Sequence, residues 1–138
     1  MTESGAPSPA NTLQHILGQI TGLAGWRRAG VAVLAGAVTA LAFAPFYALP
    51  LMAVGFSALI LLIDGAKAAG HPHRAAFSVG WFFGFGYFLV GVYWMAFSFF
   101  VQADQFAWMA PFAVMGMPDF LALFTGAATL LAARFWPS

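Results

Sequence analysis

Four long apolar segments dominate this sequence, and most charged residues fall outside them or at their ends. Only 7% of the 138 residues are charged and 62% are hydrophobic, whereas soluble domains carry roughly 25% charged residues. Water does not tolerate contiguous apolar surface on the scale that these segments would present. The sequence therefore predicts an all-α integral membrane protein whose apolar segments are surrounded by lipid.

Each apolar segment is a predicted transmembrane helix, and together they form a membrane region at residues 29–138. Residues 29–46 and 48–63 would each extend roughly 25 Å, slightly less than the ~30 Å hydrocarbon core. We therefore expect local thinning of the bilayer or buried helix ends there. Residues 75–101 and 106–136 exceed the roughly 20 residues that a crossing requires, so these helices are expected to tilt or to extend into the interface.

Residues 1–28 precede the membrane region and are predicted to form a cytoplasmic tail that contains a short amphipathic segment. Residues 1–12 are rich in Pro, Ser, Gly and Thr and lack apolar periodicity, which predicts no regular structure. Residues 13–26 carry apolar side chains at helical spacing, which is typical of a helix that lies on the membrane surface.

A secretory signal peptide is the alternative interpretation of the first apolar segment. That segment follows two arginines and contains Ala42-Phe43-Ala44, which matches the A-x-A pattern of a cleavage site. However, Pro45 comes next, and a second apolar segment begins at once instead of a polar mature domain. We therefore expect the segment to be retained as a membrane span.

The basic residues predict how the chain is oriented. If all four segments span the membrane, the five basic residues lie on one side: Arg27, Arg28, Lys67, Arg74 and Arg134. The loop at residues 102–105, on the other side, has Asp104 as its single charge. The positive-inside rule then places both termini in the cytoplasm.

Several function classes find no support in the residues. The net charge is only +1 and the basic residues are scattered, so no nucleic-acid partner is expected. His71 and His73 have no Cys, Asp or Glu at ligand spacing, so a solvated loop is favoured over a metal site. The sequence contains no cysteine, phosphate-binding loop, zinc helix motif or nucleophile elbow. We expect no metal, no cofactor and no catalytic residue within this chain.

The third apolar segment carries a row of small residues. At 100° per residue, its members fall within about 40° of one another on the helix surface; they are Gly80, Gly84, Gly91 and Ser98. Small residues allow close approach of a second helix, and such packing holds membrane helices together. We therefore predict a helix-packing seam there. Aromatic residues near it, including Trp81, Tyr93 and Trp94, are typical of interfacial anchors.

Asp119 is the one acidic residue inside an apolar segment. An ionised carboxylate at the centre of a membrane helix costs roughly 2.5–3.5 kcal/mol on insertion scales. Pro118 frees a backbone carbonyl one turn earlier, which could open a small polar pocket. Two interpretations stay open: a proton or substrate site, and a neutral, hydrogen-bonded carboxyl that supports the bundle.

Several short runs, in order and spacing, resemble the N-terminal membrane part of apolipoprotein N-acyltransferases. They are Leu41-Ala42-Phe43-Ala44-Pro45-Phe46, the glycine-rich run from Gly80 to Gly86, Gly91-Val92-Tyr93-Trp94, Leu123-Phe124-Thr125-Gly126 and Trp136-Pro137. The resemblance covers roughly residues 29–137, and Asp119 is not part of its pattern.

Members of that family are bacterial inner-membrane enzymes that move an acyl chain from a phospholipid to the N-terminal, diacylglyceryl-modified cysteine of a lipoprotein. Their catalytic Cys, Glu and Lys belong to a nitrilase-like domain outside the cytoplasmic membrane. This chain has no Cys, and its only Glu and Lys are Glu3 and Lys67, so no catalytic residue carries over. We therefore expect the membrane portion of such an enzyme, inactive alone, as a truncated product, a gene fragment or part of a split protein.

The resemblance implies that this portion anchors a catalytic domain and shapes a lateral entrance for acylated substrates. Its expected partners are membrane phospholipids, and a lipoprotein substrate once the catalytic domain is joined. Trp81, Tyr93 and Trp94 are the candidate residues of a lipid or substrate groove. Two alternatives remain: an oligomeric four-span transporter that couples to protons through Asp119, and a structural membrane scaffold.

Overall fold

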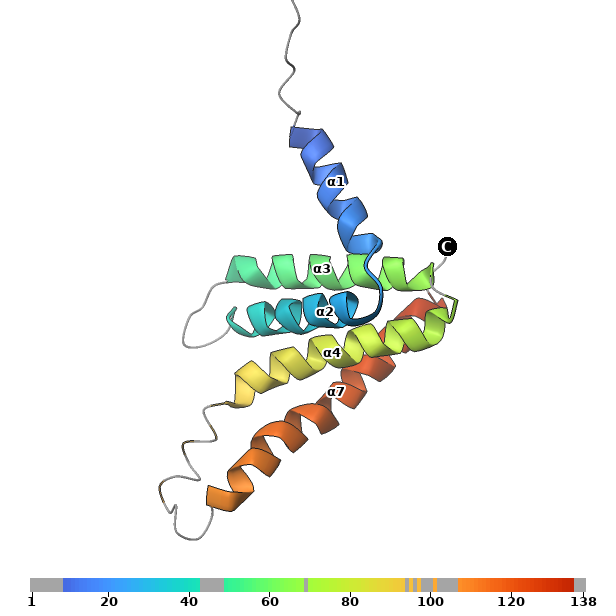
Figure 1. Ribbon diagram of the computed structural model, residues 1–138. Coiled ribbons are helices and arrows are strands. Elements are labelled where there is room, and N and C mark those ends of the chain that lie inside the picture. The colour runs from blue at the N-terminus through green and yellow to red at the C-terminus, as the bar shows by residue number, and fades with distance from the viewer. Residues whose placement is uncertain are drawn as a thin grey trace, which may run out of the picture.

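The computed structural model (Figure 1) describes residues 9–42, 49–68, 70–93, 95, 97, 101 and 107–135. Within these ranges all regular structure is helical, which confirms the predicted all-α fold. The elements are α1 (Pro9–Thr21), α2 (Gly25–Ala40), α3 (Leu49–Lys67), α4 (Pro72–Val92), the 3-10 helix η1 (Ala107–Met109) and α7 (Ala110–Phe135).

Helix α1 begins at Pro9, earlier than the helix expected from residue 13. Proline is favoured in the first helical turn, because the N–H that it lacks has no partner there. After α1 ends, Gly25 adopts a φ of 57° at the start of α2, a left-handed conformation that glycine adopts without steric penalty. Helix α1 lies at a steep angle to α3 (Figure 1).

Helices α2, α3, α4 and α7 form the body of the molecule. Helix α2 packs between α3 and α4, and α4 packs between α2 and α7 (Figure 1). Helices α4 and α7 converge toward the end of α7 and separate toward its beginning. The starts of α2 and α4 lie at the same end of the bundle as the ends of α3 and α7 (Figure 1). We call this the basic end, because it gathers Arg27, Arg28, Lys67, Arg74 and Arg134.

Among the residues that the structure describes, three helices are long and apolar enough to cross a membrane: α3, α4 and α7. Helix α2 has 16 residues, which corresponds to roughly 24 Å and is short of a hydrocarbon core. The predicted end of the first span, at residue 46, lies outside the described residues. The described part of the chain is therefore a helical bundle with three candidate membrane spans.

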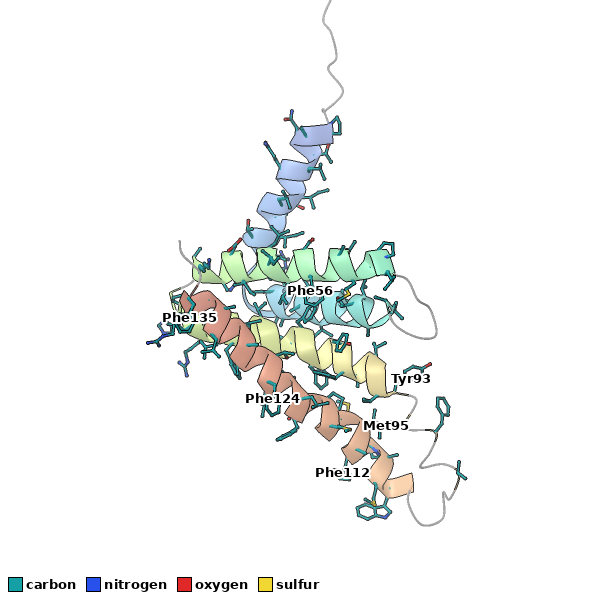
Figure 2. All side chains as sticks on the ribbon, turned by 180° about the vertical axis from the view of Figure 1, so that it is seen from behind. Phe56, Tyr93, Met95, Phe112, Phe124 and Phe135 are labelled. Atoms are coloured by element: carbon teal, nitrogen blue, oxygen red, sulfur yellow. The ribbon has the colours of Figure 1, made fainter. Side chains whose placement is uncertain are left out.

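The interior is built mainly from small and medium-sized side chains, with Phe83 as its one aromatic member. Its core cluster joins α2, α3 and α4 and consists of Ala32, Ala35, Leu59, Leu62, Ala66, Val79 and Phe83. The large aromatics of α7 point away from this core, toward the outside of the bundle: Phe112 is 73% exposed and Phe124 is 65% exposed (Figure 2). This distribution suits a bilayer, because lipid solvates phenylalanine and packing between small residues holds the helices together.

Candidate functional site

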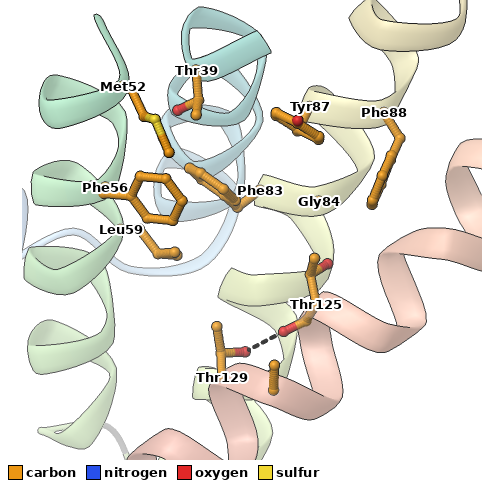
Figure 3. Close-up of a pocket in the computed structure, with 11 residues that line it drawn as sticks. Thr39, Met52, Phe56, Leu59, Phe83, Gly84, Tyr87, Phe88, Thr125 and Thr129 are labelled. Carbon is orange, nitrogen blue, oxygen red and sulfur yellow. Dashed lines mark hydrogen bonds between the residues drawn. The ribbon is translucent and has the colours of Figure 1, made fainter. Parts of the chain in front are cut away.

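An apolar pocket of about 260 Å³ lies between four helices of the bundle (Figure 3). Helix α3 contributes Met52 and Phe56 to its wall, α4 contributes Phe83 and Tyr87, and α7 contributes Thr125. Helices α3 and α7 have few contacts with each other. Phe56 is 43% exposed, so the pocket reaches the outer surface of the bundle between these two helices.

A second pocket of about 250 Å³ continues the first toward the basic end. The two pockets share Leu59, Ala128 and Thr129, and the second extends to Asp64 and Lys67. Lys67 Nζ lies 3.4 Å from Asp64 Oδ1 in an ion pair at that end. We call the two pockets together the α3–α7 groove. It is an apolar channel along α3 with charged groups at one end.

Aromatic rings and threonines form the wall of the first pocket. The rings of Phe56 and Phe83 lie 5.9 Å apart between centroids. Each threonine hydroxyl there donates to backbone carbonyls: Thr39 to Ala35 O at 2.7 Å and Thr125 to Ala122 O at 2.9 Å. The single hydroxyl hydrogen of Thr129 is shared among Ala76 O of α4 at 3.0 Å and two carbonyls of α7, Gly126 O at 2.9 Å and Thr125 O at 3.1 Å. Because these hydroxyl protons are engaged, the wall presents a surface suited to hydrocarbon rather than to a polar ligand.

The structure places two members of the predicted small-residue seam at the contact between α4 and α7. A Cβ at Gly80 would overlap Thr129, and a Cβ at Gly84 would overlap Thr125. At Gly91 a Cβ would meet no atom within 4 Å. Ser98 lies outside the described residues. The close approach therefore covers the first two positions, because α4 and α7 separate beyond them.

The aromatic residues chosen from the sequence lie elsewhere. Trp81 stacks on Phe85, with centroids 5.7 Å apart and planes inclined by 17°. Tyr93 is 52% exposed and lies edge-on to Phe97. Neither Trp81 nor Tyr93 lines the α3–α7 groove, and Trp94 lies outside the described residues.

Sequence reasoning missed the aromatics that do line the groove. Phe83, Tyr87 and Phe88 share a helix with Gly84, so the position of the seam could have directed attention to them. Phe56 comes from another helix, and no signal in the sequence relates it to the others.

Asp119 lies on the exposed face of α7, next to the buried Pro118. No hydrogen bond or ion pair joins it to another residue in the described part of the chain. That part also contains no group of three His, Cys, Asp or Glu residues that could hold a metal. The groove and Asp119 are therefore separate features.

Residues 35–138 match the family model of the apolipoprotein N-acyltransferase N-terminal domain. The chain belongs to the apolipoprotein N-acyltransferase family. Its relatives include the apolipoprotein N-acyltransferase of Rhodopseudomonas palustris, 48% identical over 115 residues, which is 81% of this chain and 21% of that protein. The enzyme of Rhizobium rhizogenes is 43% identical over 129 residues, and that of Brucella suis biovar 1 is 46% identical over 129 residues, each covering 90% of this chain and 24% of the relative.

These matches confirm the family resemblance found in the sequence. The chain spans between a fifth and a quarter of the length of these curated apolipoprotein N-acyltransferases. The matched domain corresponds to the N-terminal membrane portion of the family and contains every residue that lines the α3–α7 groove.

Proposed function

We propose that this chain forms the membrane portion of an apolipoprotein N-acyltransferase, an enzyme that transfers an acyl chain from a phospholipid to the N-terminal cysteine of a lipoprotein. The observation that carries this proposal is the family match across residues 35–138. In this proposal the chain anchors the catalytic part and receives acyl chains from the bilayer.

The α3–α7 groove supports the second of these roles. Its apolar wall fits a hydrocarbon chain, and its opening between α3 and α7 faces the lipid side of a membrane bundle. A lipid tail can enter such a groove sideways without passing through water, which matters because exposing each CH₂ to water costs about 0.8 kcal/mol. Trp81 and Tyr93 do not line this groove, so they, together with Trp94, stay proposed as interfacial anchors.

The proposal includes four spans, with both termini in the cytoplasm and the chain in the bacterial inner membrane. Helix α2 would be the additional span, shortened to about 24 Å and accommodated by local thinning of the bilayer. The gathering of the basic residues at one end of the bundle supports this orientation, because Lys and Arg concentrate on the cytoplasmic side of membrane proteins.

We also propose that the chain is inactive by itself. Acyl transfer through a thioester needs an activated thiol, and these 138 residues contain no cysteine. Lys67, the single lysine, pairs with Asp64.

A chimera tests both proposals. In cells depleted of their own enzyme, three forms are expressed: this chain, the Rhodopseudomonas palustris enzyme without its matching segment, and a chimera in which this chain replaces that segment. Mass spectrometry of a lipoprotein's N-terminal peptide measures N-acylation. We expect N-acylation only in the cells that express the chimera. Acylation by this chain alone would refute its inactivity, and a stably inserted chimera without activity would refute the assignment of this chain as the enzyme's membrane portion.

A second candidate function rests on Asp119: a proton-coupled transporter that works as an oligomer. Its carboxyl lies on the exposed face of α7, where a partner subunit could reach it. In vesicles reconstituted with the chain, Asp119→Asn would abolish proton-driven flux under this alternative. An unchanged flux would eliminate it.

A further inference from the structure

A third pocket, of about 200 Å³, lies at the basic end of the bundle between α2 and α4. Its wall includes Gly25, Arg28, Ala75, Ser78, Val79 and Phe82. We call it the Arg28 pocket. It shares no lining residue with the α3–α7 groove, and its one charged lining group is the guanidinium of Arg28.

The guanidinium of Arg28 is held in place by two backbone carbonyls. Its Nε donates to Leu23 O at 2.8 Å, and its Nη2 donates to Gly65 O at 3.2 Å. These bonds use two of the five N–H donors of a guanidinium. The group is partly buried, so its charge is less screened than that of a surface arginine. A planar guanidinium already held in position is well suited to binding a phosphate.

The described residues that line the Arg28 pocket supply no negative charge, and the acidic residue nearest along the chain to its carbonyl partner Gly65, Asp64, pairs with Lys67. No carboxylate is among its lining residues. The first turn of α2 contains no acidic residue, and its N-cap, Ala24, makes no side-chain hydrogen bond. Arg27 and Arg28 both lie in that turn, where the helix dipole is positive and disfavours cations. A bound anion would offset this unfavourable arrangement.

The size and location of the Arg28 pocket indicate which anion it would bind. Pockets that enclose a whole small molecule usually measure roughly 300–1,000 Å³, so this pocket fits a headgroup rather than a complete lipid. Val79 and Phe82 provide an apolar part of its wall, beside which acyl tails can continue along the outside of the bundle. Basic pockets between membrane helices on the cytoplasmic side are suited to anionic headgroups.

We propose that the Arg28 pocket binds the phosphate of an anionic phospholipid from the cytoplasmic leaflet. This lipid differs in position from one whose acyl chain occupies the α3–α7 groove. It stabilises the junction of α1, α2, α3 and α4, because Arg28 already bridges to Leu23 and Gly65 there. The inference requires membrane insertion but not acyl transfer, so a test of lipid binding is independent of the enzymatic proposal.

Native mass spectrometry of the detergent-solubilised chain tests this proposal. The probes are phosphatidylglycerol and phosphatidylcholine with identical acyl chains, and inorganic phosphate. We expect phosphatidylglycerol to bind at least about fivefold more tightly than phosphatidylcholine, and Arg28→Gln to remove that preference, since one basic residue contributes about 1 kcal/mol toward an anionic lipid. Arg27→Gln is the matched control. It removes an exposed arginine from the same helical turn that does not line the pocket. We expect it to change affinity less than about twofold, because exposed charges are strongly screened by solvent.

Ser78→Leu provides a second variant that leaves Arg28 and its two carbonyl bonds intact. The larger side chain fills the pocket and should weaken phosphatidylglycerol binding as Arg28→Gln does, with helix content checked by circular dichroism. Equal losses in the Arg27 and Arg28 variants would indicate diffuse surface charge and overturn the proposal. So would unchanged binding in Ser78→Leu, the absence of any lipid preference in the unsubstituted chain, or displacement of the lipid by millimolar inorganic phosphate.

Discussion

Gly80 on α4 lies so close to Thr129 on α7 that a Cβ at the glycine would overlap the threonine Oγ1. The same hydroxyl donates a hydrogen bond to Ala76 O, one turn earlier on α4, at 3.0 Å. The absence of a side chain at Gly80 therefore permits both the close packing and the interhelical hydrogen bond. One turn later Gly84 meets Thr125 in the same way, so two glycines and two threonines hold this crossing.

Gly80→Ala is expected to destabilise the bundle by roughly 1–3 kcal/mol, because an added methyl must push the two backbones apart. Gly91→Ala is the matched control on the same helix, since a Cβ there meets no atom within 4 Å. It should leave stability unchanged or raise it by up to about 1 kcal/mol, as glycine in a helix is less favourable than alanine. Unfolding in mixed detergent micelles measures both. Equal losses of stability would show that close packing is not what Gly80 provides.

Thr129→Val keeps the side-chain volume and removes the hydroxyl that reaches α4. We expect a loss of about 0.6 kcal/mol, the average for hydrogen bonds between membrane helices. Thr125→Val should change stability less, because the Thr125 hydroxyl donates to Ala122 O of its own helix. The same unfolding measurement compares the two. A larger effect at Thr125 would contradict this account of the crossing.

Ala128→Phe is expected to lower the rate of acyl transfer by the chimeric enzyme at least about tenfold. Ala128 lines both pockets of the α3–α7 groove, and excluding two methylene groups of a bound chain removes roughly 1.6 kcal/mol of binding. Ala127→Phe is the control, since Ala127 is also exposed on α7 but lines neither pocket. Mass spectrometry of the lipoprotein N-terminus gives the rates. Full activity in Ala128→Phe would exclude the groove as the path of the acyl chain.

The chain contains no cysteine, so single cysteines can report its orientation without background. Ala24→Cys and His73→Cys lie on exposed positions at the basic end and are expected to resist a membrane-impermeant maleimide in intact cells. Val101→Cys, at a position that is 83% exposed, should react from outside. Labelling after membrane disruption provides the positive control. If Ala24→Cys and His73→Cys differ in accessibility, the proposed placement of both termini cannot hold.

Hydropathy and composition were sufficient to predict the helical membrane fold, and the quoted runs were sufficient to identify the family. Helix ends were harder to predict. The third segment was expected to run to residue 101; α4 ends at Val92, and most of residues 94–100 lie outside the described part of the chain. A continuous apolar run by itself does not reveal where a helix ends. The seam was found from periodicity, yet periodicity could not distinguish Gly80, which meets a partner helix, from Gly91, which does not.

The sequence by itself determined that these segments are helices and that lipid is the solvent that suits them. In a bilayer each backbone N–H and C=O must be satisfied internally, so a local apolar run is enough to specify a helix. Only the tertiary structure decided that Phe56 of α3 joins Phe83 of α4 in one groove, and that Arg28 reaches Gly65 O of α3. These pairs depend on how helix surfaces fit together, which is a property of residues far apart in the chain and leaves no periodic signal in the sequence.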